Sequence, residues 1–482
     1  MALDTIPKQE GGKLKAVASG TLPSGQPVIV NSDGTVSVVE GTAEALSSPA
    51  VFNSGNTLYN SVTFDSNSNK IVMVYADTSN SSYGTAIVGT VSGNTISFGT
   101  EVVFQSVSSQ YIAATFDSNS NKVVIAYGNV ASSGRGTAVV GTVSGTSISF
   151  GTPVVFETGD SDYIATAFDS SNNKVVISYR DAGDSGYGKA VVGTVSGTAI
   201  SFGSIATFES ASTFYTTATF DSTSNKVVIA YTDGGNSTYG TAVVGTVSGT
   251  GISFGTPVVW QSKAGTRPSA VFDSTSNKVV IAYYTSTGTQ GEAVVCTVSG
   301  TSISFGAIAV FNTGNVGVQD MRASFDSTNN KIVVAYQDAG DSNLGKLTVG
   351  TVSGTSISFD PSVVFETGAT YFIGSAFDSN AGKTVISYAD YGAGPDGTVV
   401  VFQNASTTLT SENYIGMSTG GTVADTGNAT IDIVGTVNKE QSGLTAGQQY
   451  YVQLDGTIGT TPADPSVLAG TAVSATKMVV KS

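Results

Sequence analysis

The chain has 482 residues, more than one ordinary core accommodates, so several domains or a repeat architecture are expected. Hydrophobic residues make up 40% and charged residues only 11%, with 58 glycines and no histidine, which excludes a disordered chain and leaves the usual ligands of transition metals missing. The net charge of −15 excludes nucleic acid and anionic lipid as partners, because nothing would neutralise their phosphates.

The N-terminal segment, residues 1–42, lacks the apolar core of a signal peptide, and no stretch of 18 apolar residues occurs anywhere in the sequence. We therefore expect neither export by an ordinary signal peptide nor insertion into a membrane. Within this segment, Leu22–Val36 aligns without a gap on Leu444–Ile458, with seven of fifteen positions identical. Asp33-Gly34 and Asp455-Gly456 stand at matching positions and predict hairpin turns.

A repeat of about 52 residues fills residues 43–403. Each copy contains four β-rich runs separated by turn residues, which predicts an all-β fold, a seven-bladed β-propeller with four strands in each blade. We expect the phenylalanine of the motif Phe-Asp-Ser-x-x-x-Lys to be buried between blades. The motif begins at Phe64, Phe116, Phe168, Phe220, Phe272, Phe325 and Phe377.

The four runs of a copy differ in character. The first is small and suits the crowded axis, and the second and third are apolar throughout, as in KVVIAY and TAVVGTV. The fourth carries Pro153, Pro257 and Pro361, which indicates an outer strand. The last copy lacks a fourth run, and Ser48–Phe52 matches Thr152–Phe156. The N-terminal side is therefore predicted to supply the outer strand of the last blade.

Comparison of the copies separates constant from variable connections. Asp-Ser-x-x-x-Lys and Val-Ser-Gly-Thr are constant and lie on one face, where turn chemistry explains them. The variable connections lie on the opposite face, which is the candidate binding face. Five residues before each motif phenylalanine, near the channel mouth, stand Tyr59, Tyr111, Tyr163, Tyr215, Arg267, Asp320 and Phe372.

Aromatic rings stack on the apolar faces of sugars, and phenolic hydroxyls form hydrogen bonds with them. The ring positions Tyr59, Tyr111, Tyr163, Tyr215, Arg267 and Phe372 are therefore the candidate ligand-binding residues. The alternative is that they only fill the channel. The fifth copy diverges most, because Arg267 and Thr285 replace the usual tyrosine and aspartate. It is either a specialised pocket or a contact surface.

Several residues have simpler interpretations. Cys296 has no thiol partner, and Trp260 stands where other copies have phenylalanine, so both are expected in the core. A calcium site is an alternative use of the repeated aspartates, although such positions commonly form Asx-turns, and we expect no metal and no cofactor. The repeated aspartates and their neighbours are Asp77, Asp181, Asp184, Asp233, Asp338, Asp341 and Asp390.

An enzyme is the alternative of a different class. Sialidases are propellers that use three converging arginines, whereas Arg135, Arg180, Arg267 and Arg322 fall at four different repeat positions and are not expected to converge. Acid and base work requires a pair of carboxylates, and no spacing singles out a pair. The candidates are Glu157, Glu209 and Glu366. We therefore expect no enzyme, with a sialidase-like or polysaccharide-degrading propeller as the alternative.

The C-terminal segment, residues 404–482, carries a family resemblance. Its sequence GLTAGQQYYVQLDGTIGTTPADPSVLAGTAVSATKMVVKS resembles the C-terminal module of tail-fibre and other virion surface proteins of marine bacteriophages. The repeat, FDSTSNKVVIAYTDGGNSTYGTAVVGTVSG in the fourth copy, is similar to repeats in proteins of the same phages. Residues 1–42 and 404–482 are predicted to form one or two small β modules beside the last blade.

The resemblance implies a non-enzymatic structural protein of the virion, on a tail fibre or the capsid surface. It is expected to be made in the host cytoplasm without a signal peptide and to stand in several copies or as a homo-oligomer on the particle. The terminal modules would dock on other virion proteins, and the exposed propeller would bind host-surface glycans. A capsid-decorating protein without a receptor is the alternative within the same class.

Overall fold

The computed structural model describes residues 8–10, 12–286, 289–314, 316–392, 394–463 and 465–481, with the side chains of 8–10 and 316–320 outside the description. Besides strands, the described chain contains two single-turn 3-10 helices, η1 (Thr78–Asn80) and η2 (Val130–Ser132). The predicted all-β class is confirmed. No helix among the described residues is long and apolar enough to cross a membrane. The chain divides into two compact units, Met1–Ala45 with Asn404–Ser482, and Leu46–Gln403.

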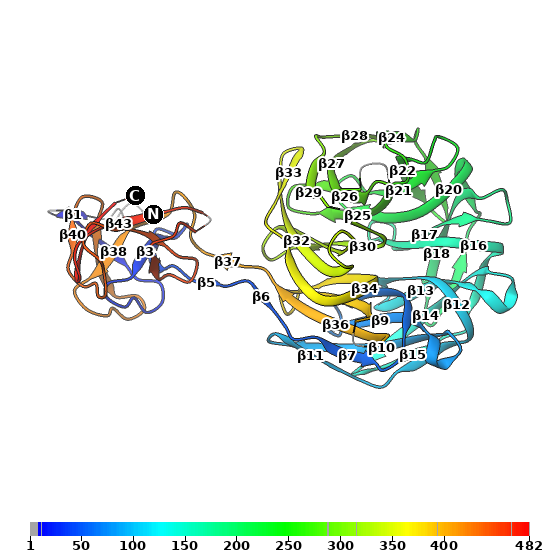
Figure 1. Ribbon diagram of the computed structural model, residues 1–482, viewed down its shortest axis with the longest axis horizontal. Coiled ribbons are helices and arrows are strands. Elements are labelled where there is room, and N and C mark those ends of the chain that lie inside the picture. Colours follow the sequence, from blue (N-terminus) through cyan, green and yellow to red (C-terminus); the bar gives the residue numbers. More distant parts are fainter. Residues whose placement is uncertain are drawn as a thin grey trace. The chain divides into compact units, whose positions relative to one another are not determined.

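The Leu46–Gln403 unit consists of the seven copies, which follow one another around a common centre (Figure 1). The second strands are β9 (Lys70–Asp77), β13 (Lys122–Asn129), β17 (Lys174–Asp181), β21 (Lys226–Asp233), β26 (Lys278–Tyr284), β31 (Lys331–Asp338) and β35 (Lys383–Asp390). The third strands, antiparallel to them, are β10 (Tyr83–Ser92), β14 (Arg135–Ser144), β18 (Tyr187–Ser196), β22 (Tyr239–Ser248), β27 (Gly291–Ser299), β32 (Leu344–Ser353) and β36 (Asp396–Gln403).

The predicted fourth run is split into two pieces that both pair with the third strand. Proline lacks the N–H that a ladder needs, and Pro153 lies in the break between β15 and β16. The short first pieces are β11 (Thr95–Phe98), β15 (Ser147–Phe150), β19 (Ala199–Phe202), β23 (Gly251–Phe254), β28 (Ser302–Phe305) and β33 (Ser356–Phe359).

In four places the second piece continues without interruption into the first strand of the next copy. These long strands are β12 (Val102–Asp117), β16 (Val154–Asp169), β20 (Ala206–Asp221) and β34 (Val363–Asp378). Elsewhere the two parts are separate strands, β7 (Ala50–Asn53) and β8 (Thr57–Asp65), β24 (Val258–Gln261) and β25 (Arg267–Asp273), and β29 (Ala309–Asn312) and β30 (Val316–Asp326). Strand β7 pairs antiparallel with β36, so a segment before the first copy completes the sheet of the last copy.

The second strands are buried along most of their length because both of their faces are covered. In β9, Val72 and Val74 pack into one core cluster with the second copy, while Ile71, Met73 and Tyr75 pack into another that contains residues of the seventh copy. The tyrosine at this position is fully buried in all seven copies, as Tyr75, Tyr127, Tyr179, Tyr231, Tyr283, Tyr336 and Tyr388. Trp260 and Cys296 are buried in the core as predicted.

The motif phenylalanines differ from their prediction. Phe168, for example, is half-buried and packs at the edge of its cluster. It stands one residue before the aspartate that begins the turn, so only part of its ring reaches the core. The predicted turn chemistry is confirmed, because Asp169 accepts hydrogen bonds from the backbone N–H groups of Ser171 and Asn172 at 2.9 and 3.0 Å.

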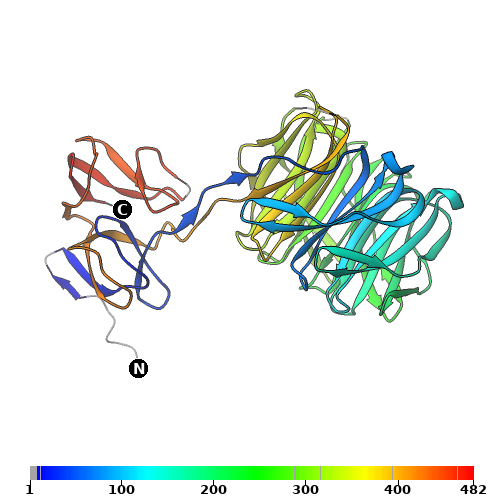
Figure 2. The same cartoon turned by 90° about the horizontal axis from the view of Figure 1, so that it is seen from below.

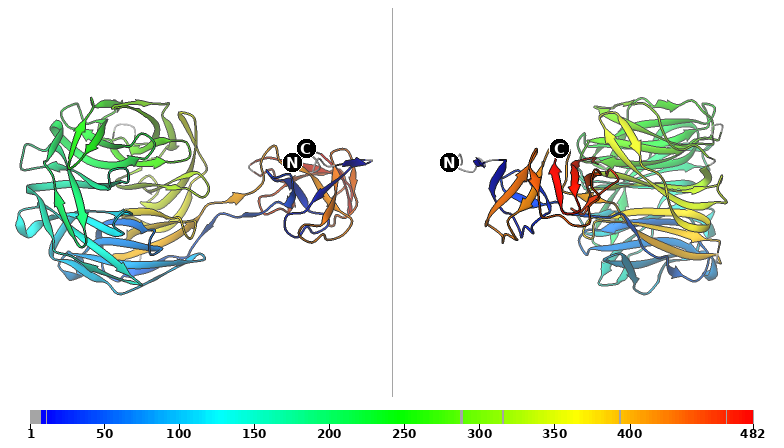
Figure 3. Two further views of the ribbon diagram at one scale, coloured as in Figure 1. Left: turned by 180° about the vertical axis from the view of Figure 1, so that it is seen from behind. Right: turned by 60° about the vertical axis from the view of Figure 1, so that its left-hand side comes forward.

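The second compact unit combines both ends of the chain. Its six-stranded sheet has the order β1-β2-β39-β38-β3-β4, so two C-terminal strands lie between two pairs of N-terminal strands, drawn in orange and blue in Figures 2 and 3. A five-stranded sheet has the order β40-β44-β43-β41-β42. The predicted modules 1–42 and 404–482 thus form one body rather than two.

The N-terminal strands of this unit are β1 (Lys8–Glu10), β2 (Lys13–Val17), β3 (Pro27–Val30), β4 (Val36–Val38) and β5 (Gly41–Thr42), followed by β6 (Ala45–Leu46) at the boundary. The C-terminal strands are β37 (Ser406–Thr407), β38 (Tyr414–Thr419), β39 (Asn428–Ile433), β40 (Val437–Asn438), β41 (Gln449–Val452), β42 (Ile458–Gly459), β43 (Leu468–Ser474) and β44 (Lys477–Val480). The hairpin turns predicted at Asp33 and Asp455 are confirmed, since each carboxylate accepts the backbone N–H of the threonine two residues later at 3.0 Å.

Candidate functional site

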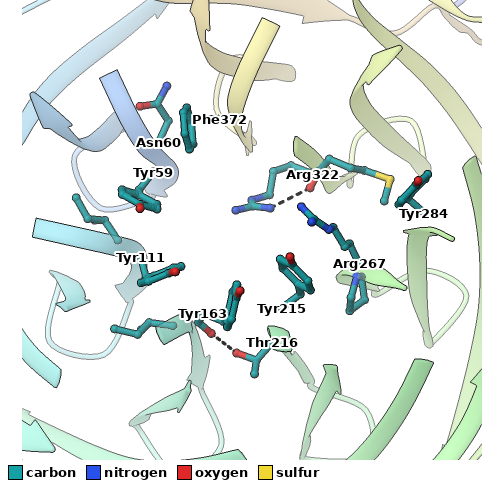
Figure 4. Close-up of a pocket in the computed structure, with 14 residues that line it drawn as sticks. Tyr59, Asn60, Tyr111, Tyr163, Tyr215, Thr216, Arg267, Tyr284, Arg322 and Phe372 are labelled. Carbon is teal, nitrogen blue, oxygen red and sulfur yellow. Dashed lines mark hydrogen bonds between the residues drawn. The ribbon is translucent and has the colours of Figure 1, made fainter. Parts of the chain in front are cut away.

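A cavity of about 340 Å³ opens where the first strands of the copies meet, within the size range of small-molecule sites. All six candidate residues from the sequence line it, whereas the side chain of Asp320 lies outside the described residues. Figure 4 shows the aromatic side chains arranged as an arc, with two arginines beside them. The lining consists of Tyr59, Asn60, Tyr111, Ile112, Tyr163, Ile164, Tyr215, Thr216, Arg267, Pro268, Tyr284, Met321, Arg322 and Phe372.

Five of these rings form a continuous chain of aromatic contacts, which we call the aromatic arc: Phe372, Tyr59, Tyr111, Tyr163 and Tyr215. Neighbouring ring centroids are 5.6, 5.2, 5.0 and 4.5 Å apart in that order, each pair tilted by 47–58°. Tilted aromatic pairs at such distances are attractive. The rings of the arc therefore stabilise one another in the orientation that lines the cavity.

Each ring of the arc is aimed by a β-bulge. In β16 the pairing with β17 shifts between Asp162 and Ala165, and Tyr163 adopts the left-handed conformation with φ 48°. The other members of the arc stand at equivalent shifts, with φ between 50° and 55°. A residue other than glycine in this conformation costs about 1–3 kcal/mol, and such strain clusters at functional sites. The repeated strain points to a selected ring orientation.

The fifth copy interrupts this pattern. Pro268 follows Arg267 and restricts it to extended backbone, so Arg267 does not adopt a positive φ and β25 pairs with β26 without a shift. The guanidinium of Arg267 lies over the ring of Tyr215, 4.0 Å from its centroid. Tyr284, the cross-strand partner of Arg267, adds another aromatic wall. The last ring of the arc, Tyr215, thus carries the guanidinium of Arg267 on its face.

The expectation that the arginines do not converge is wrong for two of them. Arg322 lines the same cavity as Arg267 although it stands three, not five, residues before its motif phenylalanine. Other copies carry a small residue there, and two such residues, Ser61 and Ser269, accept the backbone N–H of the next first strand. Arg322 is too long for that role and extends into the cavity (Figure 4). Comparison of the copies at this position could have found it.

A carboxylate stands beside the arc. Asp162 precedes Tyr163 and is held by Arg180 at 2.9 Å, and Arg180 also stacks on Phe214. Burial, and after it the negative charge of Asp162, raises the pKa of Tyr59 and of Tyr111. Burial raises the pKa of Tyr163 to about 12. The hydroxyls of Tyr59, Tyr111 and Tyr163 therefore keep their protons and can donate hydrogen bonds at physiological pH.

Asn60 is a lining residue that sequence reasoning missed. It is 3% exposed, and neither polar atom of its side chain meets a hydrogen-bond partner within the described part of the chain. Ile112 and Ile164 occupy the equivalent positions in the next copies. An unsatisfied buried amide costs about 1–3 kcal/mol, so this wall of the cavity favours a hydrogen-bonding guest or water.

The glutamates weighed as acid or base have other partners. Glu157 accepts the hydroxyl of Tyr179 at 3.0 Å and the N–H of Gly159, and Glu366 accepts the hydroxyl of Tyr388 at 2.8 Å. Glu209 bonds Tyr231 in the same way, at 3.0 Å. Each glutamate thus satisfies the buried tyrosine of the following copy.

The repeated aspartates form turns and ion pairs. Asp181 accepts the N–H of Asp184, and Lys189 bridges both carboxylates at 2.6 and 2.8 Å. Lys346 bridges Asp338 and Asp341 in the same way. Among the residues that the structure describes, no three or more His, Cys, Asp or Glu side chains gather as metal ligands would.

Fold and site together define an all-β repeat protein with a preformed aromatic cavity where its copies meet. The sequence matches no protein-family model, and no curated protein matches it. Among solved structures, the BP39L lectin from Burkholderia pseudomallei is similar, with a TM-score of 0.52 and 11% identity over 79% of this chain and 99% of that chain.

Two further structures are more distant in shape. A protein of unknown function from Dyadobacter fermentans has a TM-score of 0.45 and 12% identity, covering 76% of this chain and 99% of its own. A chain of a mitotic checkpoint complex has a TM-score of 0.48 and 10% identity, covering 74% and 93%. At these identities the likeness concerns the fold alone.

Proposed function

We propose that the Leu46–Gln403 unit is a seven-bladed β-propeller that binds glycans in its aromatic cavity. In this proposal each copy is one four-stranded blade, and β7 completes the seventh. The observation that carries the binding function is the aromatic arc: five rings in mutual contact, four of them with a phenolic hydroxyl, around a cavity of about 340 Å³. Such a wall offers stacking for sugar faces and donors for sugar hydroxyls at little entropic cost.

The BP39L neighbour is a lectin, and its fold is compatible with this proposal, but the support comes from the arc itself. A cavity that only needed filling would take aliphatic residues without backbone strain. Here five copies keep an aromatic residue in a left-handed bulge. We further infer a binding protein without catalytic activity, because the candidate glutamates each bond a core tyrosine.

For the whole chain we propose a non-enzymatic structural protein of a bacteriophage virion, in which the terminal unit docks on the particle and the propeller is exposed to host-surface glycans. The resemblance of residues 404–482 and of the repeat to marine phage proteins supports this role. Several copies on the particle would multiply weak individual contacts into firm attachment. Assembly would follow synthesis in the host cytoplasm.

The test is binding of the purified full chain to an array of bacterial surface polysaccharides. We expect binding, and we expect the double variant Tyr111→Ala, Tyr163→Ala to weaken it at least about tenfold, because two stacking surfaces are lost. The matched control is Tyr391→Ala, which removes a tyrosine that is 42% exposed and does not line the cavity. Circular dichroism and denaturation of each variant establish that the fold is kept.

Three outcomes would contradict the proposal. An array without binding, or unchanged binding by the double variant, would favour a capsid-decorating protein without a receptor. Release of reducing sugar from an array polysaccharide by the purified chain would favour an enzyme.

A further inference from the structure

The cavity has two electrostatically different sides. The aromatic arc presents ring faces and phenolic hydroxyls, whereas Arg267 and Arg322 bring two cations from consecutive copies to the other side. The whole chain has only 20 Lys and Arg against 35 Asp and Glu. Because the chain is so acidic, two cations at one small cavity indicate a site for an anionic group and not a general property of the surface.

Arg267 is positioned by stacking on an aromatic ring and not by an ion pair with a carboxylate. Within the described part of the chain it forms no ion pair, and its guanidinium face stacks on Tyr215 at 4.0 Å from the ring centroid. Stacking through the face fixes the guanidinium plane and leaves its N–H edge for a planar anion. Arg180 is the contrast in the same chain, because its stacked guanidinium already binds Asp162 at 2.9 Å.

The arginines give the cavity a direction, because Tyr59 and Tyr111 lie across it from Arg267 and Arg322 (Figure 4). Asp162, next to Tyr163 of the arc, is already paired with Arg180 at 2.9 Å. An anionic group on a ligand is therefore attracted to the arginine side. The uncharged ring face of the same ligand then lies toward the arc.

We propose that the cavity selects an acidic sugar, one that carries a carboxylate or a sulfate, and that Arg267 binds the anionic group while Tyr111 and Tyr163 stack on the sugar ring. Arg322 lies beside this position and adds positive charge. Guanidinium binds such groups through two parallel, charge-assisted hydrogen bonds, which are about twice as strong as neutral ones. This inference rests on the proposed glycan-binding function.

The experiment uses the full chain and three oligosaccharides that differ only at the terminal residue: glucuronate, glucose 6-sulfate, and glucose, the last being the carboxyl-reduced form of the first. We expect at least one acidic probe to bind about tenfold more tightly than the glucose probe at low salt. Arg267→Gln is expected to remove that difference between the acidic probes and the glucose probe. Added salt should weaken only the acidic probes.

Two further variants make the result specific. Arg135→Gln changes the net charge equally at an exposed site away from the cavity and should change nothing. Arg267→Lys keeps the charge without the planar fork and should retain only part of the preference. The ratio between the two acidic probes tells which anion the site prefers.

Equal binding of acidic and neutral probes, with both dependent on Tyr111 and Tyr163, would overturn this inference and leave the glycan-binding function standing. A preference for acidic probes that survives Arg267→Gln would overturn the role of Arg267. Absence of binding to all three probes and to the polysaccharide array would overturn both.

Discussion

At the residue scale, each member of the aromatic arc is a tyrosine or phenylalanine whose backbone adopts the left-handed conformation. The sequence has a tyrosine at a fixed distance before four of the seven motif phenylalanines, and this is sufficient to expect these tyrosines at the channel mouth. It does not reveal the left-handed conformation, because glycine is the usual residue there and these copies carry tyrosine or phenylalanine. Under the proposed function, the tyrosine ring contacts the glycan, which glycine could not do.

This strain is measurable at one position. Both Tyr163→Gly and Tyr163→Ala remove the ring, but alanine keeps a Cβ in the left-handed region, so we expect the glycine variant to be about 1 kcal/mol more stable in urea denaturation. Tyr284 provides the control, because it lines the same cavity from regular strand backbone. There glycine should be the less stable of the two. The same order at both positions would contradict the assigned conformation.

At the element scale, the sequence of the repeat predicts where the strands lie, but it predicts only some of the residues that are buried. Continuous apolar runs correctly indicate strands packed on both sides, and the prolines correctly mark a weak outer edge. What the pattern cannot tell is which aromatic residue of a copy is central. Phe168 stands at the end of a strand and is half-buried, whereas Phe156 is 6% exposed, with its ring centroid 5.3 Å from that of buried Tyr179.

The difference predicts a stability order. Phe156→Ala empties a filled core position and should cost about 3–5 kcal/mol of unfolding free energy. Phe168→Ala should cost distinctly less, because the side chain of Phe168 is only partly buried. Reversible denaturation of both variants decides the order. An equal or larger loss for Phe168→Ala would mean that the motif phenylalanine is the central core residue after all.

At the scale of the whole molecule, strands from the N-terminal part of the chain pair with strands from its C-terminal part in both units. Strand β7 pairs with β36, and in the terminal sheet two C-terminal strands lie between two pairs of N-terminal strands. The similarity of Leu22–Val36 to Leu444–Ile458 hints at this association, since the two segments form equivalent hairpins. It cannot reveal that the strands interleave, because pairing partners far apart in sequence are fixed only by the fold.

The two units have different proposed roles, glycan binding for Leu46–Gln403 and docking on the particle for the terminal unit. One measurement can therefore test whether the aromatic cavity is the glycan site. Hydrogen–deuterium exchange of the full chain, with and without the tightest-binding array polysaccharide, follows every backbone segment at once. Bulges expose amides that a regular ladder would protect. We predict slower exchange with the polysaccharide at residues 110–113, 162–165 and 214–217 and at Arg267, with the terminal unit unchanged. Slower exchange confined to the terminal unit or to the outer strands would contradict a glycan site in the aromatic cavity.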